Sequence, residues 1–353
     1  MSADELTTRS VPQTRWGAAW WLAVALVVAA VGAWEWRMRS LGLQAGDLDD
    51  SKSHWAVERR KVAAGEHDNV VIIGSSRILF DTDLAAWEEM TGRKPIQLAL
   101  AGTNPRPFLH DFAEHSDFSG LLVVGVTPDL FYTDWLGIPE FAGLLQFWND
   151  ESPSQRFGHR VGLELSRHLA FLDSAYRLGT LIDRGAAFAD REGVRGPVRD
   201  VWKLWWTSDD RQTFLWSRIE TDERLREHAR WVWGPFTGEP VEQDLIDRVI
   251  DEVRQDVGKI RARGGEVVFI RCPSAELYYE SESWSAPRSR IWEPLLEKTG
   301  AFGFHFEDYQ ETQRLEVPEW SHLSRDSARR FTQTYVGALV RELPWLVESR
   351  PAE

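Results

Sequence analysis

Short apolar runs that end in turn residues place the strongest limit on how this chain folds. Strands without a polar face are typical of parallel sheets covered on both sides. Helical patterns separate these runs, among them Asp81–Thr91 and the long segment Val241–Arg263. Alternating strands and helices predict an α/β fold with a parallel sheet. The pattern predicts four strands, over Val70–Ile73, Pro95–Ala101, Leu121–Val126 and Glu266–Ile270.

The stretch from about 130 to 240 interrupts this alternation. It is mostly helical in pattern, and we interpret it as an insertion at the edge of the sheet, acting as a cap or a surface for a membrane or envelope protein partner. Its tryptophans are expected to form its core, although one or two could instead stack on a sugar ring. The tryptophans concerned are Trp135, Trp148, Trp202, Trp205, Trp206, Trp216, Trp231 and Trp233.

The overall charge and the cysteine count exclude several classes of protein. The net charge of −14 offers no basic excess to neutralise phosphates, so a nucleic-acid partner is not expected. Cys272 is the single cysteine, which excludes an intrachain disulfide and a cysteine-based metal site. It lies near the end of an apolar run and is expected to be a buried strand residue. We see no ligand cluster and no dinucleotide fingerprint, so no metal or organic cofactor is predicted.

A charge-free segment, Trp16–Trp34, precedes the strands. About 20 apolar residues cross a hydrocarbon core of about 30 Å, and tryptophans stand at both ends of this segment, where indole rings favour the headgroup region. The sequence therefore predicts a membrane anchor over 16–36. A buried core helix and a cleaved signal peptide are the alternatives. Arginines flank the segment on both sides, so charge does not decide its orientation. The predicted organisation is a tail (1–15), the anchor (16–36), a stalk with a first helix (37–68), an α/β domain (69–345) that carries the insertion, and a second tail (346–353).

Two turns that follow strands carry groups suited to acyl transfer. After the first strand, Ser76 would open a helix, whose N-terminal partial charge favours a developing alkoxide; the alternative is that Ser75 and Ser76 only cap the helix. After the second, Gly102 could offer a backbone N–H and Asn104 a side-chain amide to an oxyanion. The alternative there is an ordinary Asn-Pro turn. Ser75, Arg77 and Thr127 are further residues that could line such a site.

A third segment, Glu319-Trp320-Ser321-His322, lies close to the end of the chain. A histidine can accept the proton of a serine hydroxyl when a carboxylate holds its other ring nitrogen. Glu319, three residues before His322, can take that position on a tight turn. Ser76, His322 and Glu319 are therefore the predicted nucleophile, base and orienting acid.

With these motifs, the chain resembles the SGNH hydrolase (GDSL-like) superfamily, over about 70–135 and 240–345. Gly74-Ser75-Ser76 is similar to the Gly-Asp-Ser block, Gly102 to the oxyanion glycine, and Glu319-x-x-His322 to the final Asp-x-x-His block. The resemblance implies a flavodoxin-like three-layer α/β/α fold and a membrane-anchored esterase or O-acyltransferase. In it, the N–H groups of Ser76 and Gly102, with Asn104, would form the oxyanion hole.

The resemblance further implies an acyl ester substrate, expected on a cell-surface polysaccharide, and a single-pass protein of the inner membrane with its catalytic domain outside the cytoplasm. Three positions depart from the family pattern: Ser75 and Glu319 each replace an aspartate, and Thr127 replaces the oxyanion asparagine. A non-catalytic scaffold for envelope polymer assembly or export is therefore an alternative. A phosphate-binding α/β domain that uses Gly74–Arg77 as an anion nest is a third possibility.

Overall fold

The structure is a computed structural model that describes residues 16–63, 69–134, 138–187, 200–234 and 238–347. The predicted tail over 1–15, Trp135 and most of the predicted tail over 346–353 lie outside these residues. The centre of the fold is a five-stranded sheet in which every neighbouring pair is parallel. Its strands, in spatial order, are β2 (Ile96–Gln97), β1 (Val70–Ile73), β3 (Leu121–Gly125), β6 (Glu266–Arg271) and β7 (Phe302–His305).

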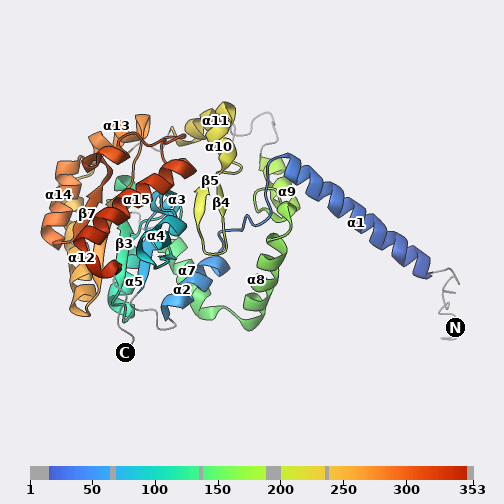
Figure 1. The fold of residues 1–353 in the computed structure, drawn as a ribbon, viewed down its shortest axis with the longest axis horizontal. Coiled ribbons are helices and arrows are strands. Elements are labelled where there is room, and N and C mark those ends of the chain that lie inside the picture. Colours follow the sequence, from blue (N-terminus) through green and yellow to red (C-terminus); the bar gives the residue numbers. More distant parts are fainter. Residues whose placement is uncertain (1–15, 64–68, 135–137, 188–199, 235–237, 348–353) are drawn as a thin grey trace, which may run out of the picture.

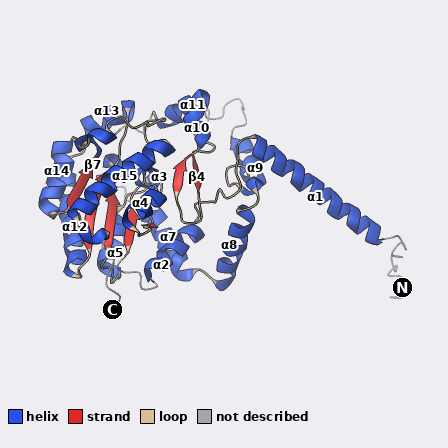
Figure 2. Ribbon diagram, viewed as in Figure 1, coloured by secondary structure: helices blue, strands red, loops and turns tan. Residues whose placement is uncertain are grey.

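This order is that of flavodoxin-like doubly wound sheets, in which the chain reverses direction of travel between the first and third strands. Successive side chains of a strand point to opposite faces, and both faces are covered. Val71 and Ile73 of β1 belong to one apolar core, whereas Val70 and Ile72 belong to the other. Figure 2 shows the strands enclosed between helices. The α/β class with a parallel sheet, predicted from the sequence, is confirmed.

Helices from distant parts of the chain cover the two faces. The first core includes residues of α2 (Lys52–Ala63), α5 (Arg106–His115), α12 (Gln243–Ala262) and α14 (Arg288–Thr299). The second includes residues of α3 (Ser76–Asp81), α4 (Leu84–Thr91) and α15 (Arg325–Glu342). Two further helices lie at the carboxyl end of the sheet, α6 (Pro128–Phe131) and α13 (Glu276–Ser285). Short 3-10 turns complete this part of the fold at η2 (Phe306–Asp308), η3 (Gln310–Thr312) and η4 (Pro344–Leu346).

Two glycines let α3 approach the sheet closely. A Cβ at Gly74 would lie 2.3 Å from Ile78 Cγ2, and a Cβ at Gly125 would lie 2.5 Å from the same atom. Since real Cβ atoms do not approach other atoms so closely, only glycine at both strand ends leaves room for Ile78. The helix that begins with Ser76 is thereby held against the ends of β1 and β3.

The insertion contains more than helices. The segment has helices α7 (Ile138–Asp150), α8 (Pro153–Ser166), α9 (Leu178–Ala187), α10 (Ser217–Thr221) and α11 (Glu223–Trp233), with the 3-10 turn η1 (Ala170–Leu172). It also forms an antiparallel hairpin of β4 (Trp205–Thr207) and β5 (Thr213–Leu215), which the sequence pattern did not predict. The expectation that its tryptophans form a core holds in part: Trp205, Trp206 and Trp233 are partly buried and pack against the second core, and Trp148 packs against the first. Trp216 is 6% exposed, but Trp202 and Trp231 are 39% and 40% exposed.

The hairpin docks on the open edge of β2 through Arg211, which is fully buried. Its guanidinium donates to the carbonyl oxygens of Gln97 and Ala99 at 2.8 and 2.9 Å. It also pairs with Asp50, with Nη2 2.8 Å from Oδ1. The insertion therefore lies at the edge of the sheet, as predicted, and satisfies carbonyls that an edge strand would leave unpaired.

The apolar N-terminal segment forms a single helix, α1 (Trp16–Ser40), that projects from the domain (Figure 1). By length and composition it could cross a membrane, and none of its most apolar window is buried. The alternative of a buried core helix is therefore wrong. Its last turns are attached to the insertion, because Glu35 accepts hydrogen bonds from the N–H groups of Ala170 and Phe171, both at 3.0 Å.

Several predicted boundaries need correction. The helix predicted over 81–91 begins only at Leu84, because Asp83 caps it by accepting from the N–H of Ala86. The strand predicted over 95–101 is regular only over Ile96–Gln97, although the N–H groups of Leu98 and Leu100 still donate to the carbonyls of Ile72 and Gly74 at 2.8 and 2.9 Å. Strand β7 was not predicted; its Phe-Gly-Phe-His sequence is too short to show a period.

Candidate active site

A cleft of about 560 Å³ opens at the carboxyl end of the sheet. Parallel α/β sheets bind their ligands at this end, where the strand order reverses. Turns after β1, β2 and β3 each contribute to it, as does the loop before α15, and the insertion contributes the opposite wall. The residues that line the cleft include Ser76, Arg77, Phe80, Gly102, Thr127, Asp129, Leu204, Trp205, Trp233, Tyr278, Ser321 and His322.

Glu319 and His322 form a buried pair. Glu319 Oε1 lies 2.8 Å from His322 Nδ1 and also accepts a hydrogen bond from the His322 backbone N–H at 2.6 Å. The other oxygen, Oε2, accepts from the indole N–H of Trp233. An ionised carboxylate only accepts hydrogen bonds, so a neutral His322 ring would carry its proton on Nδ1. That assignment leaves the Nε2 lone pair available as a base.

Nε2 of His322 is buried and has no hydrogen-bond partner among the described residues. The ring stacks on Phe80, with centroids 4.3 Å apart. Ser76 is the first residue of α3 and lines the same cleft as His322. Its hydroxyl is not hydrogen bonded to Nε2 in this arrangement; such bonds are often long before substrate binds. The structure thus brings Ser76 and His322 to one cleft, with Glu319 fully buried against His322.

The turn between the acid and the histidine has an uncommon backbone. Trp320 has a φ of +77°, which a residue other than glycine adopts rarely and at a cost of about 1–3 kcal/mol. Two contacts hold it: its indole N–H donates to Glu276 Oε2 at 2.9 Å, and its carbonyl accepts from the N–H of Ala275 at 3.0 Å. This turn brings the side chains of Glu319 and His322 to face each other.

The insertion also supports this turn. Arg230 of α11 donates through Nε to the carbonyl of Pro318 at 3.0 Å, and its guanidinium lies 5.6 Å from the ring centroid of Trp320. Three residues later, Trp233 bonds the carboxylate of Glu319. A single helix of the insertion therefore contacts the acid and both of its chain neighbours. The sequence did not reveal this role because nothing local links residues 86 positions apart.

Of the three predicted oxyanion donors, two lie at the cleft and one does not. The backbone N–H groups of Ser76 and Gly102 have no acceptor among the described residues, and both residues line the cleft. Gly102 has a φ of +70°, which suits glycine. Asn104 is not brought to the cleft: it is 1% exposed, and its Oδ1 accepts from the N–H of Arg106 at the start of α5. The role predicted for Asn104 is therefore not carried forward.

Ser75 and Thr127 form a second contact across the sheet end. Their hydroxyl oxygens are 2.6 Å apart, and Ser75 is 1% exposed. Ser75 is therefore placed beneath the cleft and does not line it. Thr127, which stands where the resembled family has asparagine, does line it.

Arg77 belongs to a buried ion network. Its Nη1 lies 2.5 Å from Glu282 Oε1, and Arg271 Nη2 lies 2.5 Å from the other oxygen of Glu282. Burial alone would raise the pKa of Glu282, but the charges of Arg271 and Arg77 outweigh it and lower that pKa. Arg77 also donates through Nε to Ser321 Oγ at 3.3 Å. The network therefore fixes the strand-end turn against the histidine loop.

Two carboxyl groups near the cleft have a raised pKa, in contrast to Glu282. Burial raises the pKa of Asp81 well above its usual value, and Asp81 Oδ1 accepts from the N–H of Leu323 at 2.9 Å, next to the histidine. Burial, helped by the charge of Glu282, also raises the pKa of Asp129, which lines the cleft. Neither residue was predicted to matter, because their burial depends on the tertiary fold.

A second cavity of about 330 Å³ shares Leu204, Trp205 and Trp233 with the cleft. At its base, Lys203 Nζ lies 2.6 Å from Asp47 Oδ2 and 2.5 Å from Asp173 Oδ2. Burial raises the pKa of Asp47 to about 6, although the charge of Lys203 opposes that rise. The two cavities share a wall of the insertion, and this wall is aromatic.

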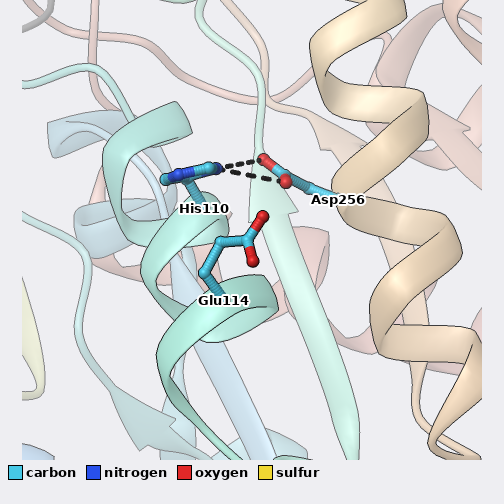
Figure 3. Close-up of side chains that lie close together, drawn as sticks. All are labelled: His110, Glu114 and Asp256. Carbon is cyan, nitrogen blue, oxygen red and sulfur yellow. Dashed lines mark hydrogen bonds and ion pairs between the residues drawn. The ribbon is translucent and has the colours of Figure 1, made fainter.

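One group of potential metal ligands lies far from this cleft. Figure 3 shows His110 and Glu114 of α5 beside Asp256 of α12, with His110 Nδ1 3.2 Å from both carboxylate oxygens of Asp256. Lys259 supplies a cation there, because its Nζ bonds Glu114 and lies 3.7 Å from Asp256. This cluster satisfies its own charges and carries no metal-site proposal.

No protein-family model, curated protein or solved structure matches the chain. Its relation to SGNH hydrolases therefore rests on the resemblance of its motifs alone. The function has to be inferred from the geometry of the cleft.

Proposed function

We propose that the protein is a membrane-anchored serine esterase or O-acyltransferase of the SGNH type. The observation that carries this proposal is the bonding of Glu319: its carboxylate accepts from His322 Nδ1 while Nε2 stays unbonded at a cleft that also contains Ser76. A structural histidine usually has both ring nitrogens satisfied, since an unpaired buried polar atom is costly. An unpaired Nε2 at the same cleft as a helix-opening serine is compatible with nucleophilic acyl transfer.

The reaction follows from these positions. Ser76 Oγ attacks the carbonyl carbon of an acyl ester, while Nε2 of His322 takes the hydroxyl proton. The N–H groups of Ser76 and Gly102 stabilise the oxyanion. When the tetrahedral intermediate collapses, Nε2 returns the proton to the leaving alcohol, and the acyl group remains on Ser76. Water or an acceptor hydroxyl then attacks the acyl-enzyme, with the same histidine as base.

The substrate class is a proposal that combines the resemblance with the shape of the cleft. Trp205 and Trp233 form part of its wall, and indole rings stack well on the apolar faces of sugar rings. An acyl ester carried by a cell-surface polysaccharide would place its sugar against that wall and its carbonyl at Ser76. We further propose that α1 is an uncleaved anchor in the inner membrane and that the domain lies outside the cytoplasm.

The contacts of α1 support retention of the anchor. Glu35 is bonded to the backbone of the insertion, and Met38 is 2% exposed against the domain. Cleavage after the charge-free segment would leave these residues as a new terminus, although they are part of the folded domain.

The test is covalent labelling of the full-length protein in detergent with a serine-directed fluorophosphonate probe. We expect labelling of the wild type, its loss in Ser76→Ala and in His322→Ala, and no change in Ser283→Ala, where the serine is exposed. Labelling that survives Ser76→Ala would refute the proposed nucleophile.

A non-catalytic scaffold is the second candidate. The observation in its favour is that Ser76 makes no hydrogen bond to His322 and that Asn104 is directed away from the cleft. It predicts that no variant changes probe labelling, because the wild type would not react at all.

A further inference from the structure

Helix α8 carries an apolar ridge on the side that faces away from the domain. Phe157, Val161 and Leu165 are spaced four residues apart and therefore lie on one side of the helix; they are 69%, 43% and 48% exposed. The partly buried side chains of the helix, among them His159 and Leu163, lie on the opposite side. No residue of α8 is buried, so the ridge has no partner within the described part of the chain.

The next helix adds to this surface. Leu178 and Ile182 of α9 are one turn apart, and they are 67% and 62% exposed. Single exposed apolar residues are ordinary, but a group of them on consecutive helices marks a contact surface. The five side chains Phe157, Val161, Leu165, Leu178 and Ile182 are called the α8–α9 face below.

The end of α1 is attached to the segment that joins these two helices. Arg39 donates through Nη2 to the carbonyl of His168 at 3.2 Å, two residues beyond the end of α8. Glu35 bonds the backbone of η1, and the N–H of Gly46 donates to the carbonyl of Ser166 at 2.8 Å. The place where α1 leaves the domain is therefore also the place where α8 ends and α9 follows.

The depth of this attachment relative to a bilayer follows from helix geometry. The charge-free segment ends at Trp34, and Arg39 lies five residues further along the same helix, about 8 Å at 1.5 Å per residue. The headgroup region on each side of the hydrocarbon core is about 5–8 Å thick. A bilayer crossed by α1 would thus bring its headgroups to the level of the η1 attachment. Figure 1 shows α8 and α9 on the side of the domain from which α1 projects.

We propose that the α8–α9 face rests on the lipid bilayer that α1 crosses, as an interfacial second contact. The inference rests on the proposed membrane insertion of α1 but not on the proposed chemistry. Amphipathic helices of this kind bury their apolar side at the boundary between headgroups and acyl chains and place arginines around it. Arg160 of α8 is exposed and lies at one margin of the ridge, which suits that position. A second copy of the chain is less suited as the occupant, because the attachment of α1 brings lipid to this face in every molecule.

The experiment uses the full-length protein in phosphatidylcholine vesicles that contain a lipid with a nitroxide near the headgroup or, for the label within α1, a lipid with a nitroxide deep in its acyl chain. An environment-sensitive fluorophore is attached to a single introduced cysteine, which is feasible because the one native cysteine, Cys272, is buried. The labelled variants are Phe157→Cys on the face, Val27→Cys within α1, and Trp284→Cys on α13. Trp284 is a matched control because it is an aromatic side chain that is 61% exposed.

We expect the nitroxide lipid to quench the label at 157 about twofold, as for an interfacial side chain, and to leave the label at 284 unchanged. Adding Val161→Asp should reduce the quenching at 157, because a charge on the ridge opposes its burial. An unquenched label at 157 with a quenched label at 27 overturns this inference alone. If the label at 27 is also unquenched, the insertion of α1 fails as well. A label at 157 that is shielded from water yet unquenched indicates contact between protein copies and also overturns it.

Discussion

The two walls of the cleft are built in different ways. The sheet wall, with Ser76, Gly102 and Thr127, consists of turns that directly follow parallel strands. The insertion wall, with Trp205 and Trp233, comes from a segment that is far from them in sequence. The sheet wall holds the proposed nucleophile, Ser76. The insertion wall acts on the proposed base, because Trp233 bonds the Glu319 carboxylate that holds His322. Short sequence motifs are therefore enough to predict where the proposed reactive groups lie. The orientation of these groups depends on contacts between residues that are far apart in the sequence.

The largest effect is expected where the two walls meet. Glu319→Gln replaces an oxygen by an amide nitrogen, so either the Trp233 indole N–H or the two His322 N–H groups lose their acceptor, and the negative charge that would stabilise a protonated His322 is removed. The comparable change in a Ser-His-Asp triad lowers kcat about 10⁴-fold through the wrong tautomer, and we expect about 10³–10⁴-fold for this buried acid. Turnover of a small aryl ester measures it, with the exposed Glu311→Gln as control. Near wild-type activity would show that Glu319 does not set the tautomer.

A pH effect should report on the second cavity, where Asp47 pairs with Lys203 of the insertion. Because burial raises the pKa of Asp47 to about 6 from 3.8, the folded protein holds a proton that the unfolded chain has lost. The contribution of this group to the free energy of unfolding is fully present below about pH 4. It is lost as the pH rises through about 6, which lowers the free energy of unfolding by about 3 kcal/mol. Asp47→Asn should remove that slope. Urea denaturation at several pH values measures it, and an unchanged slope in the variant would contradict the assignment.

The sheet wall should be sensitive to a single added methyl group. Gly125→Ala forces a Cβ against Ile78, so we expect a loss of about 1–3 kcal/mol in the free energy of unfolding from overpacking. Gly258→Ala on α12 is the matched control, because an added Cβ there would meet nothing within 4 Å; it should stabilise the helix by about 0.5–1 kcal/mol. Equal effects of the two variants in denaturant melts would argue against close packing of α3 on the sheet.

The smallest effect is expected from the support that the insertion gives to the acid. Trp233→Phe keeps an aromatic ring and removes the indole N–H, leaving Glu319 Oε2 without that donor. A hydrogen bond to a charged group contributes about 1.5–3 kcal/mol, so we expect kcat to fall about tenfold. Trp231→Phe, two residues earlier on the same helix and 40% exposed in the native residue, should have little effect. Equal losses would indicate a general loss of helix α11.

The sequence predicted the sheet class and the strand-end turns because each depends on short patterns. Val70–Ile73 has the same bounds in the structure as in the prediction. Strand β7 and the β4–β5 hairpin were missed, since their few residues are fixed by pairing with distant strands. Ser76, Gly102 and His322 were placed in one cleft by the order of their motifs. Asn104 was not, because its side chain caps α5, and an asparagine before a proline is equally suited to either role.

The contacts of Arg211 predict how a truncated form of this protein would behave. The Arg211 guanidinium occupies the carbonyl of Gln97 in β2 and that of Ala99 just beyond it, and the hairpin that carries it belongs to the insertion. A minimal version lacking residues 130–240 would keep Ser76 and His322 but expose an unprotected strand margin, which recruits strands from other molecules. Such a truncation is expected to self-associate through that margin before its chemistry can be measured. On this reasoning the insertion keeps the α/β domain soluble and also forms a wall of its cleft.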